Sequence, residues 1–323
     1  MTNKEIYKAT LVFSVRRLLY DIVCFLVLGL LAGGGFLLAD KLWDKGLVGL
    51  AVGLVAGILI LVFALRYGSY TFKAGQIAMM TLAVTEGSLP DDVFGEGVRV
   101  VRSRFLTVAL YFTATGIIKG IFNQLGKSIT NIGKAIGGDT GKSVGSAIST
   151  AVQVMVAYLC DCCLGWVFYR SDENAARATC EGAVLFFRHG KTLLKNMGRI
   201  FGMGLVSLLI IGGAFTGVFM AIFSRFPQFF EMLSSEMAEA AAQGESEIAQ
   251  LLTTPQGAMF FCAALAGVIL WSMLHSAFVR PFVLTGVLRN YLLSGMDQEI
   301  DESAFAQLDQ KSPKFAKLHR ELA

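Results

Sequence analysis

Two aspartates and a histidine stand within long apolar runs of the sequence, where an ionisable side chain could do chemistry. They are Asp161, Asp21 and His275. An ionisable group in such a run is costly in lipid and often marks the pathway of an ion or a solute. We therefore predict an intramembrane polar site that binds a proton or a cation. The alternative is structural: Asp21 would pair with Arg16 or Arg17, and Asp161 with a serine or tyrosine hydroxyl.

The spacing of cysteines and histidines argues against a metal or catalytic site. The densest group is Cys160-Asp161-Cys162-Cys163. Neighbouring residues on a helix point about 100° apart, so these thiols cannot all bind one metal ion. None of the 3 histidines is spaced from a serine or cysteine in a way that suggests a nucleophile and its base. The sequence predicts no metal, no cofactor and no enzymatic activity, and it predicts small buried thiols instead.

Membrane-spanning helices must position these residues. The chain is 54% hydrophobic and only 16% charged, and its apolar residues gather in runs long enough to cross a bilayer as helices. This pattern predicts an all-α integral membrane protein. We expect a six-helix transmembrane bundle in one domain, 1–293, followed by a C-terminal tail, 294–323. The six spans are expected at 18–38, 47–66, 105–122, 147–169, 200–223 and 258–280.

Basic residues are distributed unequally between the two sides of the predicted bundle. Most of the 28 Lys and Arg residues fall in the two termini and in the connections 66–104 and 170–199. The positive-inside rule then places both termini in the cytoplasm of a multi-pass protein, which we expect in the plasma (inner) membrane. The net charge of +4 is modest, and no basic stripe interleaved with aromatic residues suggests nucleic acid as a partner.

The stretch 181–199 predicts an amphipathic helix at the membrane surface. Its apolar residues can face lipid while its basic residues face anionic headgroups. Membrane lipids are therefore an expected partner. The alternative is a cytoplasmic extension of the fifth span. The candidate headgroup contacts are Arg188, Lys191, Lys195 and Arg199.

Glycines recur every four residues in the segment 123–146. Small residues at this spacing let helices approach each other closely in a membrane. We therefore expect a packed or re-entrant helix here, and a contact in a homo-oligomer or with a partner membrane protein. A flexible glycine-rich loop is the alternative. The candidate packing residues are Gly133, Gly137, Gly141 and Gly145.

Three parts of the chain share a pattern in which a basic amphipathic stretch precedes a span. Two of these stretches begin with a Glu-Gly pair, at Glu96-Gly97 and at Glu181-Gly182. The pattern predicts three repeated helical hairpins. The alternative is that any hairpin crossing the membrane twice has this appearance. Near the end of the sixth span, Pro281 lacks a backbone donor, so we expect a kink or a break there.

Four segments of the chain share a pattern with a known family of membrane proteins. They are Cys162-Cys163-Leu164-Gly165-Trp166, Asn174-Ala175, Leu193-Leu194-Lys195-Asn196 with Arg199, and Leu288-Arg289-Asn290. With these segments the chain resembles the choline-transporter-like membrane family. The resemblance implies a multi-pass membrane carrier, and it assigns no substrate-binding residue.

Two functions fit these observations. The first is a carrier or channel for a small cationic or amphiphilic solute, which Asp161, the glycine-rich packing and the family resemblance favour. The second is a non-transporting scaffold or accessory subunit that binds lipid and a partner membrane protein, which the scarcity of polar residues at mid-span favours. A water-filled cavity that reaches Asp161 would support the first function, and a dry apolar core would support the second.

Overall fold

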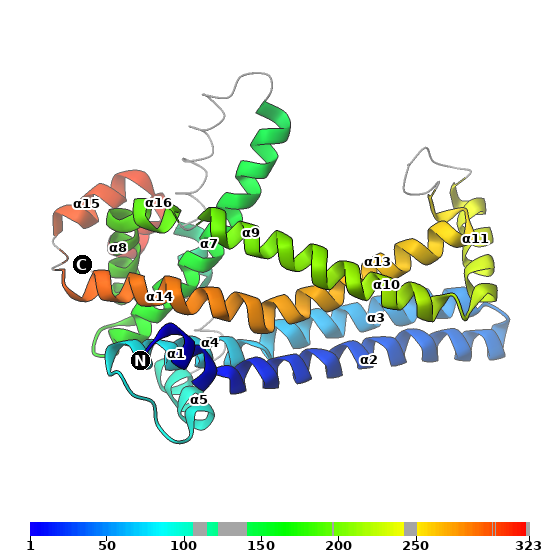
Figure 1. Ribbon diagram of the computed structural model, residues 1–323, viewed down its shortest axis with the longest axis horizontal. Helices are drawn as coiled ribbons and strands as arrows, with labels where there is room; N and C mark the ends of the chain where they lie inside the picture. Colours follow the sequence, from blue (N-terminus) through cyan, green and yellow to red (C-terminus); the bar gives the residue numbers. More distant parts are fainter. Residues whose placement is uncertain are drawn as a thin grey trace. The chain divides into compact units, whose positions relative to one another are not determined.

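The computed structural model of the protein is helical in every element that it describes (Figure 1). The chain divides into two compact units. Unit 1 comprises Met1–Met197 and Arg280–Ala323, and unit 2 comprises Gly198–Val279. The structure describes residues 1–105, 115–121, 141–195, 197–241, 251–298, 300 and 302–320.

A long helical hairpin forms the first part of unit 1. Helix α2 (Leu11–Trp43) ends where Asp44 adopts a φ of 53°, a left-handed conformation that reverses the chain into α3 (Gly46–Tyr67). The two helices run side by side (Figure 1). Many of their large apolar side chains are exposed, such as Leu30 on α2 and Phe63 on α3. A hairpin of this composition suits a lipid environment better than water.

Glycines let the two helices of this hairpin approach each other closely. Gly49 and Gly53 on α3 face Gly35 and Leu31 on α2, and a Cβ atom at either α3 position would overlap a backbone carbonyl oxygen of α2. Gly49, Gly53 and Gly57 lie four residues apart and therefore share one face of α3. This is the small-residue pattern that brings helices together in membranes.

The core of unit 1 forms where α4 (Tyr70–Thr85) meets α7 (Gly141–Tyr169) and α14 (Arg280–Met296). Residues 74–81 of α4 and 161–168 of α7 are all buried. A helix enclosed on every side must be apolar on every side, which explains why Asp161 is the one charged residue in these two segments. The other labelled helices of unit 1 are α1 (Asn3–Ala9), α5 (Val93–Arg104), α8 (Ala175–Lys195), α15 (Glu302–Lys311) and α16 (Pro313–Arg320).

Residues 294–323, which the sequence suggests to be a tail, contribute two helices to unit 1. Helices α15 and α16 both contact α8, and they bury Phe305 and Phe315. His319 stacks on Phe305 with ring centroids 4.9 Å apart, and its Nδ1 lies 3.0 Å from Asp309 Oδ2. This segment therefore folds with the body of unit 1, and its cytoplasmic location stays a prediction.

Unit 2 contains two long helical segments, and each includes a π-helical turn. Helix α10 packs along α13, where a Cβ atom at Gly267 would lie 2.9 Å from the carbonyl oxygen of Gly212. Helix α11 also packs against α13. The elements are α9 (Met197–Ser207), the π turn Leu208–Gly212, α10 (Gly213–Phe223), α11 (Pro227–Ala241), α13 (Pro255–Leu274) and the π turn His275–Val279.

The irregularity expected at Pro281 takes the form of a π turn before it. The turn His275–Val279 ends immediately before α14, and α14 then continues through Pro281 without a break. Pro281 is the second residue of α14, so its missing backbone donor falls in the first turn of that helix. A π turn is one of the recognised ways in which the regular hydrogen-bond ladder of a helix is locally interrupted.

Within the described part of the chain, four helical segments are long and apolar enough to cross a membrane. They confirm the prediction of an all-helical chain with apolar segments of membrane-spanning length. The expected span 105–122 lies largely outside the described residues, and 147–169 is represented by the shorter apolar helix Val156–Tyr169. The six-span bundle and the three repeats therefore stay predictions. The four helical segments are Leu11–Trp43, Val48–Thr85, Gly202–Phe223 and Pro255–Met296.

Candidate functional site

Asp161 binds two basic side chains at the junction of three helices. Its Oδ1 lies 2.5 Å from Nζ of Lys73 on α4, and its Oδ2 accepts a hydrogen bond of 2.6 Å from Nη2 of Arg280 on α14. Arg280 also donates to the carbonyl oxygen of Ala157 at 3.3 Å. The partners of Asp161 are thus two basic side chains and not the serine or tyrosine hydroxyl of the structural alternative. We call Asp161, Lys73 and Arg280 the Asp161 cluster.

Close packing of the three helices holds this cluster together. Gly165 lies one turn after Asp161 on α7, and a Cβ atom there would lie 2.5 Å from Leu288 Cδ1 and 3.0 Å from Thr81 Oγ1. Leu288 belongs to α14 and Thr81 to α4. The absence of a side chain at Gly165 therefore lets both neighbouring helices reach α7, which brings Lys73 and Arg280 within reach of one carboxylate.

The Asp161 cluster carries one net positive charge. Asp161 is 2% exposed, whereas the side chains of Lys73 and Arg280 are 33% and 28% exposed. A lysine offers three donors and an arginine five, and Asp161 and the Ala157 carbonyl occupy only some of these. Among the described residues, Nε of Arg280 is buried and meets no acceptor. The cluster thus retains donors for an anionic group, while its one carboxylate is already engaged.

Asp21 has partners of its own on the hairpin side of unit 1. Its Oδ2 lies 3.9 Å from Nε of Arg17, one turn earlier on α2, and its Oδ1 accepts a hydrogen bond of 3.4 Å from Ser69 Oγ. The structural alternative, in which Asp21 pairs with Arg17, is therefore the observed arrangement. The structure gives Asp21 and Asp161 different partners.

His275 lies in unit 2, whereas both aspartates lie in unit 1. Its Nδ1 lies 3.1 Å from Ser207 Oγ, and Ser207 Oγ also accepts a hydrogen bond of 3.1 Å from Trp271 Nε1. A single site formed by Asp161, Asp21 and His275 therefore stays a prediction.

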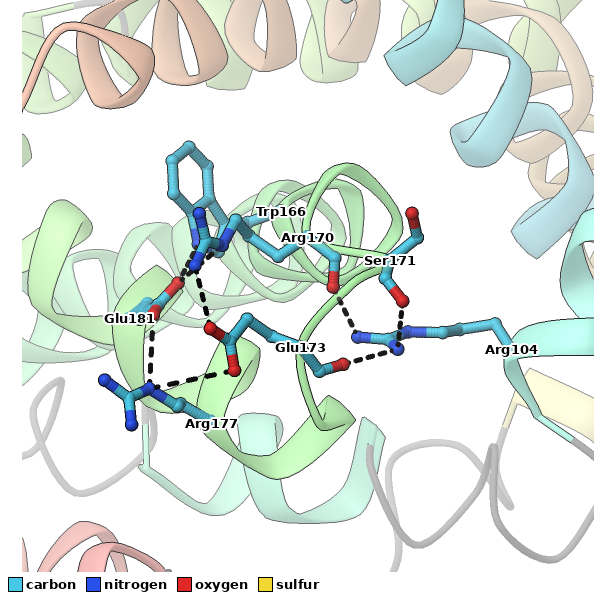
Figure 2. A network of polar contacts seen from close by, with 7 residues as sticks. All are labelled: Arg104, Trp166, Arg170, Ser171, Glu173, Arg177 and Glu181. Carbon is cyan, nitrogen blue, oxygen red and sulfur yellow. Dashed lines mark hydrogen bonds and ion pairs between the residues drawn. The ribbon is translucent and has the colours of Figure 1, made fainter.

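Glu181 is the centre of a polar network that the sequence did not reveal (Figure 2). Its Oε2 accepts a hydrogen bond of 3.1 Å from Trp166 Nε1 and lies 3.3 Å from Arg170 Nε, while its Oε1 lies 3.7 Å from Arg177 Nε. Glu173 also pairs with both arginines. The network fastens the end of α7 to the first turns of α8. The sequence pattern does not indicate these contacts, because Trp166 and Glu181 belong to different helices.

Arg104 binds the backbone of the turn between α7 and α8, next to this network. Its guanidinium donates to the carbonyl oxygens of Arg170, Ser171 and Glu173 at 2.9, 3.4 and 2.7 Å (Figure 2). Carbonyl groups at the end of a helix lack intrahelical donors, and a basic side chain satisfies them well. Arg104 is the last residue of α5, so it attaches α5 to the end of α7.

The predicted glycine packing lies mostly beyond the described part of the chain. Gly133 and Gly137 fall outside the described residues. Gly141 and Gly145 lie in the first two turns of α7, but their surroundings are outside the described part of the structure. The oligomer contact therefore stays a prediction.

The four residues predicted to contact lipid headgroups lie on helices of unit 1 and unit 2. Arg188, Lys191 and Lys195 lie on α8 and Arg199 lies on α9, but their side chains are outside the description. Lipid binding stays a prediction. Residues 178–185 of α8 are buried, and α8 packs against α7.

Three cysteines of unit 1 are small buried side chains, whereas Cys24 and Cys160 are partly exposed. Cys162, Cys163 and Cys180 are fully buried and free of disulfides. Cys163 Sγ lies 3.5 Å from the carbonyl oxygen of Thr179, which links α7 to α8. Burial raises the pKa of Cys180 to about 12. Over the described residues, His, Cys, Asp and Glu side chains form no group of three that could hold a metal ion.

Comparison with family models, with curated proteins and with solved structures found no significant match. The resemblance to the choline-transporter-like family therefore stays a prediction.

Proposed function

We propose that the protein is a multi-pass membrane carrier or channel for a small amphiphilic solute. In this proposal it lies in the plasma (inner) membrane, and both termini are in the cytoplasm. The observation that carries this proposal is the Asp161 cluster. Charged groups between apolar helices are costly, and they are found mainly where a solute or an ion passes. A chain that needed only to fill space between α4, α7 and α14 would do so at lower cost with apolar side chains.

The charges of the cluster favour a solute with an anionic group. A cationic solute would have to displace Lys73 or Arg280 from Asp161, because this is the only carboxylate in the cluster. An anionic group meets the remaining donors of the two basic residues without displacing anything. Of the two solute classes expected from the sequence, the amphiphilic class is therefore retained, with its negative end at Lys73 and Arg280.

A second candidate is a membrane-anchored scaffold or accessory subunit. The Glu181 network favours it, because a dense set of ion pairs around the α7–α8 turn is typical of a rigid folded body. The enclosed segment 161–168 of α7 also suits a body without a passage. In this case the Asp161 cluster would only join three helices.

Uptake into proteoliposomes separates the two candidates. Vesicles containing the wild type would be incubated with a mixture of small carboxylates, phosphate monoesters and quaternary amines, and their contents measured by mass spectrometry. A carrier accumulates some of the anionic or zwitterionic compounds, and Lys73→Gln, which removes one of the two basic groups proposed to bind the anionic end, reduces the uptake at least tenfold. Glu231→Gln, which alters an exposed carboxylate of α11, leaves the uptake unchanged. No uptake of any compound supports the scaffold, and uptake of cations alone contradicts the anionic preference.

A further inference from the structure

Arg16 begins a stripe of exposed side chains along helix α2. Residues that are alternately three and four positions apart lie on one face of a helix. The stripe follows this spacing from Arg16 onwards, and all of its side chains after Arg16 are apolar. A single guanidinium group therefore stands at the end of an exposed apolar face. The members of the stripe are Arg16, Leu19, Val23, Leu26 and Leu30.

An aromatic ring supports the guanidinium group of Arg16. Cζ of Arg16 lies 3.8 Å from the ring centroid of Phe94, which belongs to α5. Stacking of this kind uses the flat face of the guanidinium, and the N–H donors in its plane can still bind an acceptor. In the described part of the structure no carboxylate forms an ion pair with Arg16, whereas the neighbouring Arg17 pairs with Asp21.

Phe94 is itself held in place by the packing of α5 against α2 and α4. Its ring centroid lies 5.1 Å from that of Phe13, which is fully buried, and 6.2 Å from that of Phe72. Gly75 on α4 and Gly97 on α5 make room for Phe13, because a Cβ atom at either glycine would lie within 2.6 Å of the Phe13 ring. The support of Arg16 is therefore fixed before any ligand arrives, which lowers the entropic cost of binding.

The two acidic residues on either side of Phe94 have partners within α5. Asp92 Oδ1 accepts a hydrogen bond of 2.9 Å from the backbone nitrogen of Gly95. Glu96 accepts two hydrogen bonds from the guanidinium of Arg99. Neither carboxylate is engaged by Arg16, so the charge of Arg16 is left for an anionic group from outside the protein.

The length of the stripe matches one leaflet of a bilayer. A helix rises about 1.5 Å per residue, so Arg16 and Leu26 are separated by roughly 15 Å along the axis, half of a hydrocarbon core of about 30 Å. A phospholipid has its phosphate at the surface and an acyl chain that extends through one leaflet. The stripe presents a cation and an apolar surface in the same order and over the same distance.

From these observations we infer that the start of α2 binds one anionic phospholipid, whose phosphate contacts Arg16 and whose acyl chain lies along the apolar stripe. Phe94 positions the guanidinium for this contact. The site differs from the headgroup contacts expected on α8 and α9, because it combines a fixed cation with a surface for the chain. The inference does not rest on the proposed function, since it requires only that the α2–α3 hairpin lies in lipid.

Native mass spectrometry of the full-length protein, freed of lipid in detergent and then titrated with phosphatidylglycerol, tests the inference. We expect a saturable first binding step, which Arg16→Gln weakens about tenfold through the loss of charged hydrogen bonds. Arg102→Gln is the matched control, because it removes the same charge from an exposed position on α5, and it should leave this step unchanged. Equal effects of the two substitutions, or an unchanged affinity of Arg16→Gln, would overturn the inference.

Two further titrations test the ring and the acyl chain. Phe94→Leu keeps an apolar contact with Phe13 but removes the face beneath Arg16, so it should weaken phosphatidylglycerol binding about threefold. An unchanged affinity would contradict the role of Phe94. Inorganic phosphate and glycerophosphoglycerol, which lack acyl chains, should not displace the bound lipid. Displacement by either would show that the site binds a phosphate group alone, and equal affinity for phosphatidylcholine would contradict the preference for an anionic lipid.

Discussion

At the scale of single residues, Asp161 shows how a buried charge can be tolerated in an apolar helix. Its carboxylate is enclosed, but each of its oxygens faces a basic group, Lys73 or Arg280. The sequence indicated that Asp161 needed a partner, because an unpaired aspartate there would be too costly. It could not indicate which partner, since Lys73 and Arg280 are distant in the chain and reach Asp161 only after three helices have packed.

Removing the carboxylate should therefore destabilise unit 1. Asp161→Asn leaves Lys73 and Arg280 close together without their shared anion, and we expect a loss of about 3 to 5 kcal/mol in the free energy of unfolding. Asp21→Asn should cost less, because the Asp21–Arg17 pair is separated by 3.9 Å. Denaturant unfolding in a single detergent measures both. An Asp161→Asn variant as stable as the wild type would contradict the buried pairing.

A triple variant with Asp161→Leu, Lys73→Met and Arg280→Met should regain most of the wild-type stability. The reason is that replacing a whole buried ion cluster with apolar side chains is often neutral. The same triple variant should remain without solute uptake. Restored stability with normal uptake would show that the cluster serves the fold alone.

The thiol of Cys180 should be unreactive in the folded protein. It is fully buried, and burial raises its pKa to about 12. The reactive thiolate is therefore almost absent at neutral pH, and it becomes abundant only as the pH rises towards about 12. In a variant whose one cysteine is Cys180, maleimide should label at pH 7 only after denaturation. Asp91→Cys, at an exposed position, gives the labelled control, and rapid labelling of folded Cys180 would contradict the burial.

At the scale of elements, the sequence revealed helices better than their contacts. The glycine spacing that predicted packing in 123–146 also occurs at Gly49, Gly53 and Gly57, where the structure shows close packing. The same spacing therefore marks close packing in α3 as well. In contrast, no local signal shows that Glu181 receives a hydrogen bond from Trp166, because a Glu-Gly pair also occurs at Glu96, whose partner is the exposed Arg99.

The α2–α3 hairpin should depend on one glycine face. Gly53→Leu places a side chain against the backbone of Leu31 and Ala32, and we expect a loss of about 1 to 3 kcal/mol or separation of the two helices. Gly33→Leu is the matched control, since nothing lies within 4 Å of a Cβ atom at Gly33. Spin labels on α2 and α3 measure the separation. Equal effects of the two substitutions would argue against the close contact.

The two Glu-Gly pairs should respond differently to the same substitution. Glu181→Gln removes the charge shared by Arg170 and Arg177, so it should lower the thermal stability and alter the fluorescence of Trp166. Glu96→Gln disturbs an exposed pair with Arg99, and exposed pairs contribute little. The thermal unfolding and the tryptophan fluorescence of both variants test this prediction. Equal responses would contradict the buried network and favour the repeat prediction.

At the scale of the whole molecule, composition and apolar run length were sufficient to predict an all-helical chain with segments of membrane-spanning length. Composition and run length were insufficient to predict that the chain divides into two compact units. Hydropathy reports how apolar a segment is, but it does not report whether lipid or protein covers it. Segment 161–168 of α7 and the apolar part of α3 therefore look alike in the sequence, although the first is enclosed by protein and the second is largely exposed.

If the protein is a carrier or channel, the Asp161 cluster lies on a water-filled path within the membrane. The face of α7 beside Asp161 carries Gln153, Ala157 and Cys160, which are partly or fully exposed, whereas Cys162 and Cys163 are buried. Single cysteines at these five positions, in a chain without other cysteines, would be treated with a membrane-impermeant thiol reagent from each side. Our account predicts labelling at 153, 157 and 160 and none at 162 and 163. No labelling at any of the five would mean that the cluster is dry, and the carrier or channel proposal would then be wrong.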